Sequence, residues 1–176
     1  MRASITLATA AVALAGCQNR GPALGEPVAG GQLATAQMRT SAGADAGRAT
    51  ASEVAGGVRF TIDARGLPPG LHGVHVHTVG RCDPPGFESA GPHWNPTNSK
   101  HGPNNPQGPH LGDLPNLTIG ADGRGTIAMT MPGATMASLL DADGAAMMVH
   151  AAADDLVTDP SGNSGGRIAC GVFQLG

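Results

Sequence analysis

Short runs of alternating apolar and polar residues, separated by glycine-rich turns, constrain this chain most. They read QLATAQMRT, GRATASEVAGG, VRFTIDARGL, GVHVHTVG, NLTIGADGRGTIAMTM, AAMMVHAAA and RIACGVFQL. Alternation with a period of two places every second side chain on the same face of a strand. The ADGRG stretch has the pattern of a hairpin turn. We read ATMASLLDADG as a connecting loop, so the sequence predicts an all-β sandwich or barrel.

The composition limits both the core and the partners. With 28 glycines, 14 prolines and only 2% aromatic residues, the core must consist of aliphatic side chains and alanine. That much glycine and proline approaches a disordered composition, but the periodic apolar runs indicate a folded domain. The formal net charge is −3, and the sequence contains no basic patch. Nucleic acid is therefore not an expected partner.

The first seventeen residues, MRASITLATAAVALAGC, have the pattern of a secretory signal peptide and are too short for a permanent membrane span. Their last four residues resemble a bacterial lipobox. We therefore expect residues 1–16 to be removed and Cys17 to carry a lipid that anchors the protein to a membrane, facing the periplasm or the cell exterior. An ordinary secretory signal, with Cys17 as a bystander, is the alternative.

The remaining residues divide into a flexible tether and one domain. Residues 17–29 are rich in small and polar residues, as is typical of a tether. Residues 30–176 are enough for one domain with its own core. The chain has three cysteines, and an odd number in an exported protein needs an explanation. If Cys17 carries lipid, Cys82 and Cys170 are free to pair in an oxidising compartment.

One segment, from residue 81 to residue 115, lacks the alternating pattern and is dominated by Pro, Gly and Asn. A loop of that length inside a compact domain is uncommon and is usually functional or disordered. It contains four potential donors to tetrahedral zinc, namely His93, His101, His110 and Asp113. A bound zinc ion or a disulfide would offset the entropy lost on ordering such a loop.

A second set of histidines lies on the expected strands. His75 and His77 are two residues apart and share a strand face, whereas His72 points to the other face. A pair of this kind is weak evidence for a metal, because satisfied or surface histidines are the common alternative. Together with His150 and one histidine of the long loop, however, the pair would form an imidazole-rich site suited to copper.

On these stretches the sequence resembles the copper,zinc superoxide dismutase family. The matching stretches are GLHGVHVHTVG, SAGPHWNPTNSKHG, HLGDLPN, MMVHAAADDL and GNSGGRIACGV. They occur in the family's order. The resemblance implies a Greek-key β-barrel of about eight antiparallel strands with a long metal-binding loop and a channel loop. It also implies the conversion of two superoxide anions and two protons to dioxygen and hydrogen peroxide, by alternate reduction and oxidation of copper. It leaves open whether the protein is a homodimer or a monomer.

The resemblance further implies roles for individual residues. The implied copper ligands are His75, His77, His93 and His150. The implied zinc ligands are His93, His101, His110 and Asp113, so that His93 would bridge the two ions. Asp154 would link a copper ligand to a zinc ligand, and Arg167 would guide the anion to the copper. Cys82 and Cys170 match the family's disulfide.

Two other functions of the same fold stay open. One is an exported copper-binding or copper-delivery domain, which the loss of a copper ligand or of Arg167 would favour; neither is lost. The other is a zinc-only structural domain, which the absence of copper from isolated protein would favour.

Overall fold

The computed structural model describes residues 23–176, so the expected signal peptide and Cys17 lie outside the described residues. The described part contains nine strands, one 3-10 helix and one short α-helix. The strands are β1 (Leu33–Thr40), β2 (Asp45–Val54), β3 (Gly57–Ala64), β4 (Gly70–His77), β5 (Asp113–Ile119), β6 (Gly125–Pro132), β7 (Ala146–His150), β8 (Arg167–Val172) and β9 (Gln174–Leu175). The helices are η1 (Glu88–Ala90) and α1 (Met136–Leu139). Within residues 23–176 the helices are too short to cross a membrane.

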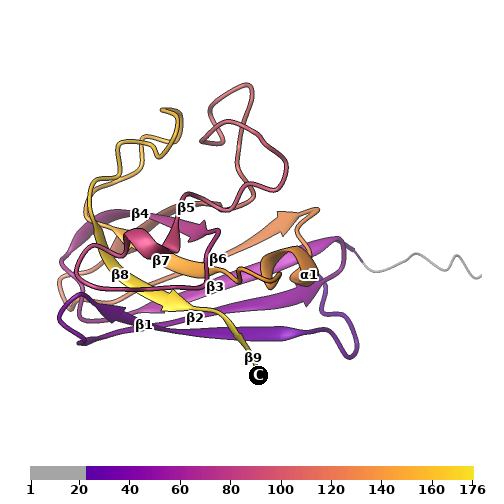
Figure 1. Cartoon of the computed structure of the whole chain (residues 1–176), viewed down its shortest axis with the longest axis horizontal. Helices are drawn as coiled ribbons and strands as arrows, with labels where there is room; N and C mark the ends of the chain where they lie inside the picture. Colours follow the sequence, from indigo (N-terminus) through magenta and orange to yellow (C-terminus); the bar gives the residue numbers. More distant parts are fainter. Residues whose placement is uncertain (1–22) are drawn as a thin grey trace, which may run out of the picture.

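The strands form one antiparallel sheet in the order β5-β4-β7-β8-β1-β2-β3-β6, with β9 beside β1. The turn between β5 and β6, in which the Gly120 N–H donates to the Arg124 carbonyl, joins the two end strands of this order and nearly closes the barrel. β3 and β4 are consecutive in the chain but not adjacent in the sheet, and neither are β6 and β7. The β3–β4 and β6–β7 connections therefore each cross an end of the barrel to reach a strand that is not the next one in the sheet (Figure 1). The predicted all-β barrel of about eight antiparallel strands is confirmed.

The alternating sequence pattern predicts which side chains are buried on β3 but not on β4 and β7. On β3, Val58, Phe60 and Ile62 are buried while Arg59 and Asp63 face solvent. Burial of each such apolar side chain stabilises the fold by about 1.5–3 kcal/mol. In contrast, all of β7 and the last six residues of β4 are buried. These two strands are therefore covered on both faces, by the core inside and by other segments outside.

Two long loops provide the outer cover. The first long loop, residues 78–112, follows β4, and the second long loop, residues 151–166, follows β7. Both rise from the side of the barrel that carries β4 (Figure 1). Phe87 and Ala90 from the first loop pack with Met148 and Ala146 of β7 in a small apolar cluster outside the main core.

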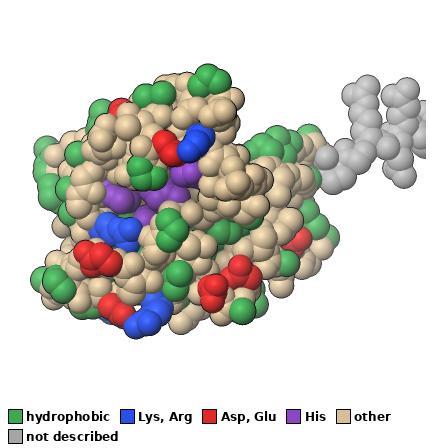
Figure 2. Space-filling model, turned by 45° about the horizontal axis from the view of Figure 1, so that its top comes forward, with side chains coloured by type: hydrophobic (Ala, Val, Ile, Leu, Met, Phe, Trp, Pro, Cys, Tyr) green, Lys and Arg blue, Asp and Glu red, His purple; other side chains and the backbone are tan. Residues whose placement is uncertain are grey.

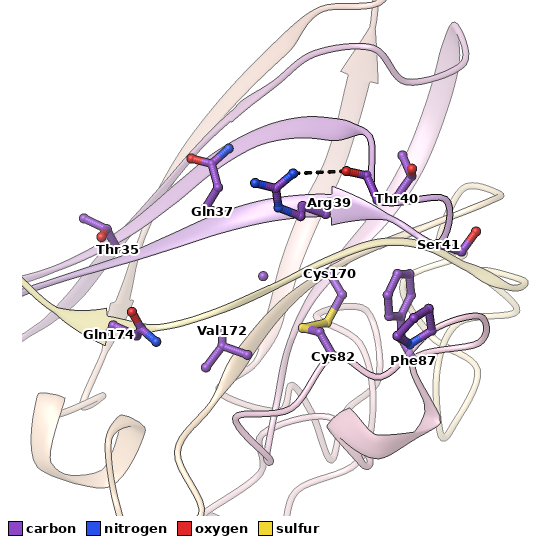
Figure 3. A pocket seen from close by; sticks show the side chains of 13 residues that line it. Thr35, Gln37, Arg39, Thr40, Ser41, Cys82, Phe87, Cys170, Val172 and Gln174 are labelled. Atoms are coloured by element: carbon purple, nitrogen blue, oxygen red, sulfur yellow. Dashed lines mark hydrogen bonds between the residues drawn. A yellow bond between two sulfur atoms is a disulfide. The ribbon is translucent and has the colours of Figure 1, made fainter.

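A disulfide between Cys82 and Cys170 ties the first long loop to β8. The two cysteines are 88 residues apart in the sequence, and on the chain-entropy estimate a cross-link of that span stabilises by about 4–5 kcal/mol. The disulfide lies beside a groove of about 420 Å³ between the outer faces of β1 and β8 (Figure 3). Among the residues that line this groove are Gln37, Arg39, Phe87 and Val172, and it lies apart from the histidines.

Two sequence expectations need correction. Residues 136–139, expected to belong to a loop, form the single turn α1, because the Thr135 hydroxyl accepts the Ser138 N–H and Met136 and Leu139 are buried. A turn this short has no detectable helical period. The tether was expected to reach residue 29, but the Gly25 and Glu26 backbones hydrogen-bond with Ala55 at 2.9 Å. The folded body therefore begins by Gly25.

Candidate metal centre

The β4 histidines lie on the two faces of the sheet as their spacing predicts. His75 and His77 are 0% and 1% exposed and face the long loops. His72 points the other way, and its ring nitrogens lie 2.8 Å from the His150 carbonyl and 2.9 Å from the Pro68 carbonyl. Its ring lies between these two backbone carbonyls and donates its N–H to one of them, which gives His72 a structural role.

Four histidines meet beneath the long loops, and we call them the cleft cluster: His75, His77, His93 and His150. Their potential ligand atoms lie within 4.8 Å of one another, although β4, the first long loop and β7 contribute them separately. The sheet register explains part of this arrangement. β4 pairs with β7 so that His77 lies opposite Ala146, and an isolated bridge joins His77 to His93.

Within residues 23–176, four buried side-chain nitrogens have no hydrogen-bond partner, and all belong to the cleft cluster. They are Nδ1 of His75 and Nε2 of His77, His93 and His150. The other nitrogen of each ring donates to an oxygen: His77 to the Gly91 carbonyl at 2.8 Å, for example, and His75 to Asp154 at 2.6 Å. Leaving one buried polar group unpaired costs about 1–3 kcal/mol. Four lone pairs gathered in one place therefore fit a bound cation, with each ring fixed in the tautomer that presents its lone pair.

Burial keeps these rings neutral. It lowers the pKa of His77 to about 2, of His150 to about 3 and of His93 to about 4. The pKa of His75 is also lowered by burial, and the hydrogen bond that His75 donates to Asp154 opposes this change. Neutral imidazole is the form that binds a metal, so protons compete only weakly with an ion at this position.

A second group of donors surrounds Asp113 at the start of β5, and we call it the Asp113 cluster: His93, His101, His110 and Asp113. Nδ1 of each of the three histidines lies 3.0–3.1 Å from Asp113 Oδ1. The other carboxylate oxygen accepts the backbone N–H groups of Gly102 and His110 at 2.9 and 3.0 Å. Three imidazole nitrogens and one carboxylate oxygen are a donor set that zinc accepts.

Ligand-atom distances alone group His75, rather than His110, with His93, His101 and Asp113. The contacts favour His110. Its Nδ1 lies 3.1 Å from the same carboxylate oxygen as the other two histidines, whereas His75 Nε2 is already bonded to Asp154. Burial alone would raise the pKa of Asp113, but its hydrogen bonds, led by those from His101 and His110, hold the pKa well below its usual range.

Asp154, at the start of the second long loop, connects the two clusters. Its Oδ2 lies 2.6 Å from His75 Nε2 and its Oδ1 lies 3.1 Å from His101 Nε2. Because both His101 nitrogens face carboxylates, the pKa of His101 is raised to about 9 even though burial opposes this. Gly162, at φ +60°, covers this contact, and a side chain there would overlap the Asp154 carboxylate.

Asn116 fixes Asp154 in turn, and the sequence reasoning missed it. The Asn116 amide donates to the Asp154 carbonyl and accepts the Asp154 N–H, both at 2.8 Å. The position of Asn116, three residues after Asp113 on β5, was the available clue.

A cleft of about 420 Å³ leads to the cleft cluster, and its lining includes His77, His93, His150, Glu88 and Arg167. Arg167 is half-buried, and its guanidinium donates to the carbonyls of Phe87 and Gly91 at 2.7 and 2.8 Å, on either side of η1. Burial lowers the pKa of Arg167, and the nearby carboxylate of Glu88 opposes that change. Figure 2 shows the histidines at the bottom of this hollow with a basic side chain beside them.

Comparisons with known proteins agree with this geometry. The family model of copper/zinc superoxide dismutase (SODC) matches residues 45–173. The superoxide dismutase-like protein YojM of Bacillus subtilis is 48% identical over 66% of this chain, which spans 63% of the length of that relative. The Cu-Zn superoxide dismutase 2 of Aquifex aeolicus is 40% identical over 80% of this chain and 86% of its own length.

A solved structure shows the same relationship in three dimensions. The crystal structure of a superoxide dismutase-like protein from Bacillus subtilis is similar to this chain with a TM-score of 0.75 and 41% identity, over 80% of this chain and 97% of that one. Sequence, fold and site thus lead to one conclusion: the chain belongs to the copper/zinc superoxide dismutase family.

Proposed function

We propose that this protein converts two superoxide anions and two protons to dioxygen and hydrogen peroxide. The cleft cluster (His75, His77, His93 and His150) would hold copper, and the Asp113 cluster (His93, His101, His110 and Asp113) would hold zinc. One observation carries the proposal: four unpartnered, buried ring nitrogens gather at the bottom of an open cleft. Bound copper supplies the redox chemistry, since it accepts and donates one electron in turn, whereas zinc has no redox chemistry.

His93 belongs to both clusters and has a further role as a proton carrier. Its Nε2 is unpartnered and lines the cleft, while its Nδ1 is held 3.0 Å from Asp113. The ring therefore stays in place whether or not Nε2 carries a proton. Nε2 would carry a proton only while it does not bind copper, and in that state we assign to this atom the delivery of a proton to the peroxide product.

Arg167 supplies the positive charge that attracts superoxide. The whole chain has a formal charge of −3, so attraction of an anion has to be local. The two backbone carbonyls that accept from Arg167 hold its guanidinium beside the histidines. They also remove its freedom to swing into solvent, which keeps the charge at the point where the substrate enters.

Export and membrane anchoring through a lipid on Cys17 are part of the proposal. They are supported by the signal-like N-terminus and by the Cys82–Cys170 disulfide, a kind of bond that persists in oxidising compartments. With these two cysteines paired, Cys17 is the remaining one. The intact mass of the mature protein tests this. Cleavage at another position, or an unmodified Cys17, would refute it.

Metal content measured alongside dismutation tests the catalytic proposal. Protein stripped of metal should be inactive, and the addition of copper and zinc should restore activity with one of each ion bound. Protein that takes up zinc but no copper would be the zinc-only domain. Protein that binds both ions yet leaves superoxide unchanged would be a copper carrier.

A further inference from the structure

Asp159, in the second long loop, reaches across to the first long loop. Its Oδ1 accepts the backbone N–H of His101 at 2.9 Å, and its Oδ2 accepts from Lys100 Nζ at 3.1 Å. The bond to His101 is partly buried, whereas the Lys100 pair is solvent-exposed, with 54% of the lysine side chain accessible. One carboxylate thus connects the two loops directly beside a member of the Asp113 cluster.

His101 is held at three atoms, two of them by the second long loop. Asp159 holds its backbone nitrogen, and Asp154 lies 3.1 Å from its Nε2. Its third contact, from Nδ1 to Asp113 Oδ1 at 3.1 Å, is the one that faces the expected zinc position. The peptide of His101 and its ring are therefore oriented from the same loop, at points five residues apart.

Backbone contacts next to His101 also connect the two long loops. The Asn104 N–H donates to the Leu156 carbonyl at 3.0 Å, and Gly102 lies too close to Leu156 to carry a side chain. The Gly102 N–H in turn donates to Asp113 Oδ2 at 2.9 Å. A displacement of the second long loop would therefore be transmitted to both sides of the Asp113 carboxylate.

We infer that Asp159 is a positioning residue for zinc. It fixes the His101 peptide so that Nδ1 faces Asp113, and it makes zinc retention depend on the order of the second long loop. This inference rests on the zinc assignment proposed above. Partners of this kind, which orient a ligand without touching the metal, typically change metal affinity by about 10–100-fold when removed.

The chain offers matched controls that separate the hydrogen bond from the charge. Asp159→Ala removes both contacts, whereas Asp159→Asn keeps an acceptor for the His101 N–H and loses the charge. Lys100→Gln removes only the exposed ion pair, which contributes little. Asp122→Asn changes a carboxylate of the same type in the β5–β6 turn, away from both loops.

The measurement is the rate of zinc release from copper-free, zinc-loaded full-length protein to the chelator 4-(2-pyridylazo)resorcinol. We expect Asp159→Ala to release zinc about tenfold faster than the wild type, at the lower end of the range for such partners. Asp159→Asn, Lys100→Gln and Asp122→Asn should stay within about threefold, because the His101 N–H keeps its acceptor in each of them. A wild-type rate in Asp159→Ala, or an Asp159→Asn rate equal to that of Asp159→Ala, would overturn the inference.

Two further measurements separate this inference from its premise. Asp113→Ala should lose zinc far faster than any of these variants. If it does not, the zinc assignment itself fails. Amide hydrogen exchange of His101 in the metal-free wild type tests the contact without any substitution. Slow exchange is expected, and exchange at the rate of an exposed loop amide would overturn the inference.

Discussion

The cleft cluster and the Asp113 cluster share His93, yet the fold constructs them differently. His75, His77 and His150 lie on β4 and β7, whose pairing register fixes their positions. His93, His101 and His110 all lie in the first long loop, and only Asp113 is on a strand. The sheet therefore positions three ligands of the cleft cluster, whereas the Asp113 cluster depends on the conformation of the first long loop. Because three of its four ligands lie on strands, we expect copper binding to depend less on the loops than zinc binding does.

The largest expected effect comes from removing a strand histidine. His150→Ala should lower dismutation at least about a hundredfold, because loss of a direct ligand exceeds the loss of an outer partner. The Asp113 cluster does not include His150, so zinc should remain bound. Metal analysis and the rate of superoxide loss are the readouts. Full activity in this variant would mean that the cleft cluster is not the copper site.

Asp113→Ala is the matched change in the other cluster. It removes the oxygen that three histidine Nδ1 atoms face, together with the acceptor for two backbone N–H groups. Zinc affinity should fall by about a hundredfold or more, and the first long loop should exchange its amides faster. A copper site with some redox activity should persist. If copper is lost as readily as zinc, the two clusters are not independently constructed.

Removing the disulfide tests how far the loop depends on being tied to β8. A Cys82→Ala, Cys170→Ala double variant should lose about 2–5 kcal/mol of unfolding free energy. It should also release zinc faster, while copper affinity changes less. Denaturant unfolding with metal analysis measures both. Equal effects on the two metals would contradict the proposed division between sheet and loop.

The cleft histidines and His101 should respond to pH in opposite directions in the metal-free protein. His77, His93 and His150 have pKa values lowered to about 2, 4 and 3, below the unfolded value of 6.5. The unfolded state therefore binds more protons below pH 6.5, and stability should fall as the pH is lowered from there, by at most about 1.4 kcal/mol per pH unit for each group.

His101 behaves in the opposite way, because its pKa is raised to about 9. Its contribution is fully present below pH 6.5 and should be lost as the pH rises through 9. Unfolding free energies of metal-free protein between pH 4 and pH 10 test both directions. A profile that stays flat below pH 6.5 would show that the cleft histidines are not desolvated.

The smallest expected effects concern the mouth of the cleft. Arg167→Ala should keep both metals but slow dismutation by roughly tenfold and flatten its dependence on ionic strength, because salt screens the attraction that is lost. Glu88→Gln removes a carboxylate that faces Arg167, so it should raise the rate up to a few-fold and steepen the salt dependence. Dismutation rates measured against ionic strength test both variants. If the rate and salt dependence of Arg167→Ala equal those of the wild type, Arg167 does not attract the substrate.

The strand part of the site was accessible from the sequence, because a period of two puts His75 and His77 on one face. The loop part was not accessible in the same way. One of the two carbonyls that accept from Arg167 belongs to Phe87, which adopts a left-handed backbone at φ 58°. The Asn116–Asp154 pair and the Asp159–His101 contact join residues 38 and 58 positions apart. Such contacts follow from loop conformation, for which alternation gives no information.

The resemblance to a family extended the prediction beyond these patterns. It placed His93 in both ligand sets, and the structure puts the two nitrogens of that ring on the two clusters. Which metal each cluster binds stays a prediction.

Anomalous diffraction from crystals of the copper- and zinc-loaded protein, collected at the absorption edges of both metals, tests the central claim most directly. We expect copper among His75, His77, His93 and His150, and zinc among His93, His101, His110 and Asp113, with His93 contacting both ions. Zinc bound by His75 in place of His110, or a single position shared by both metals, would contradict it.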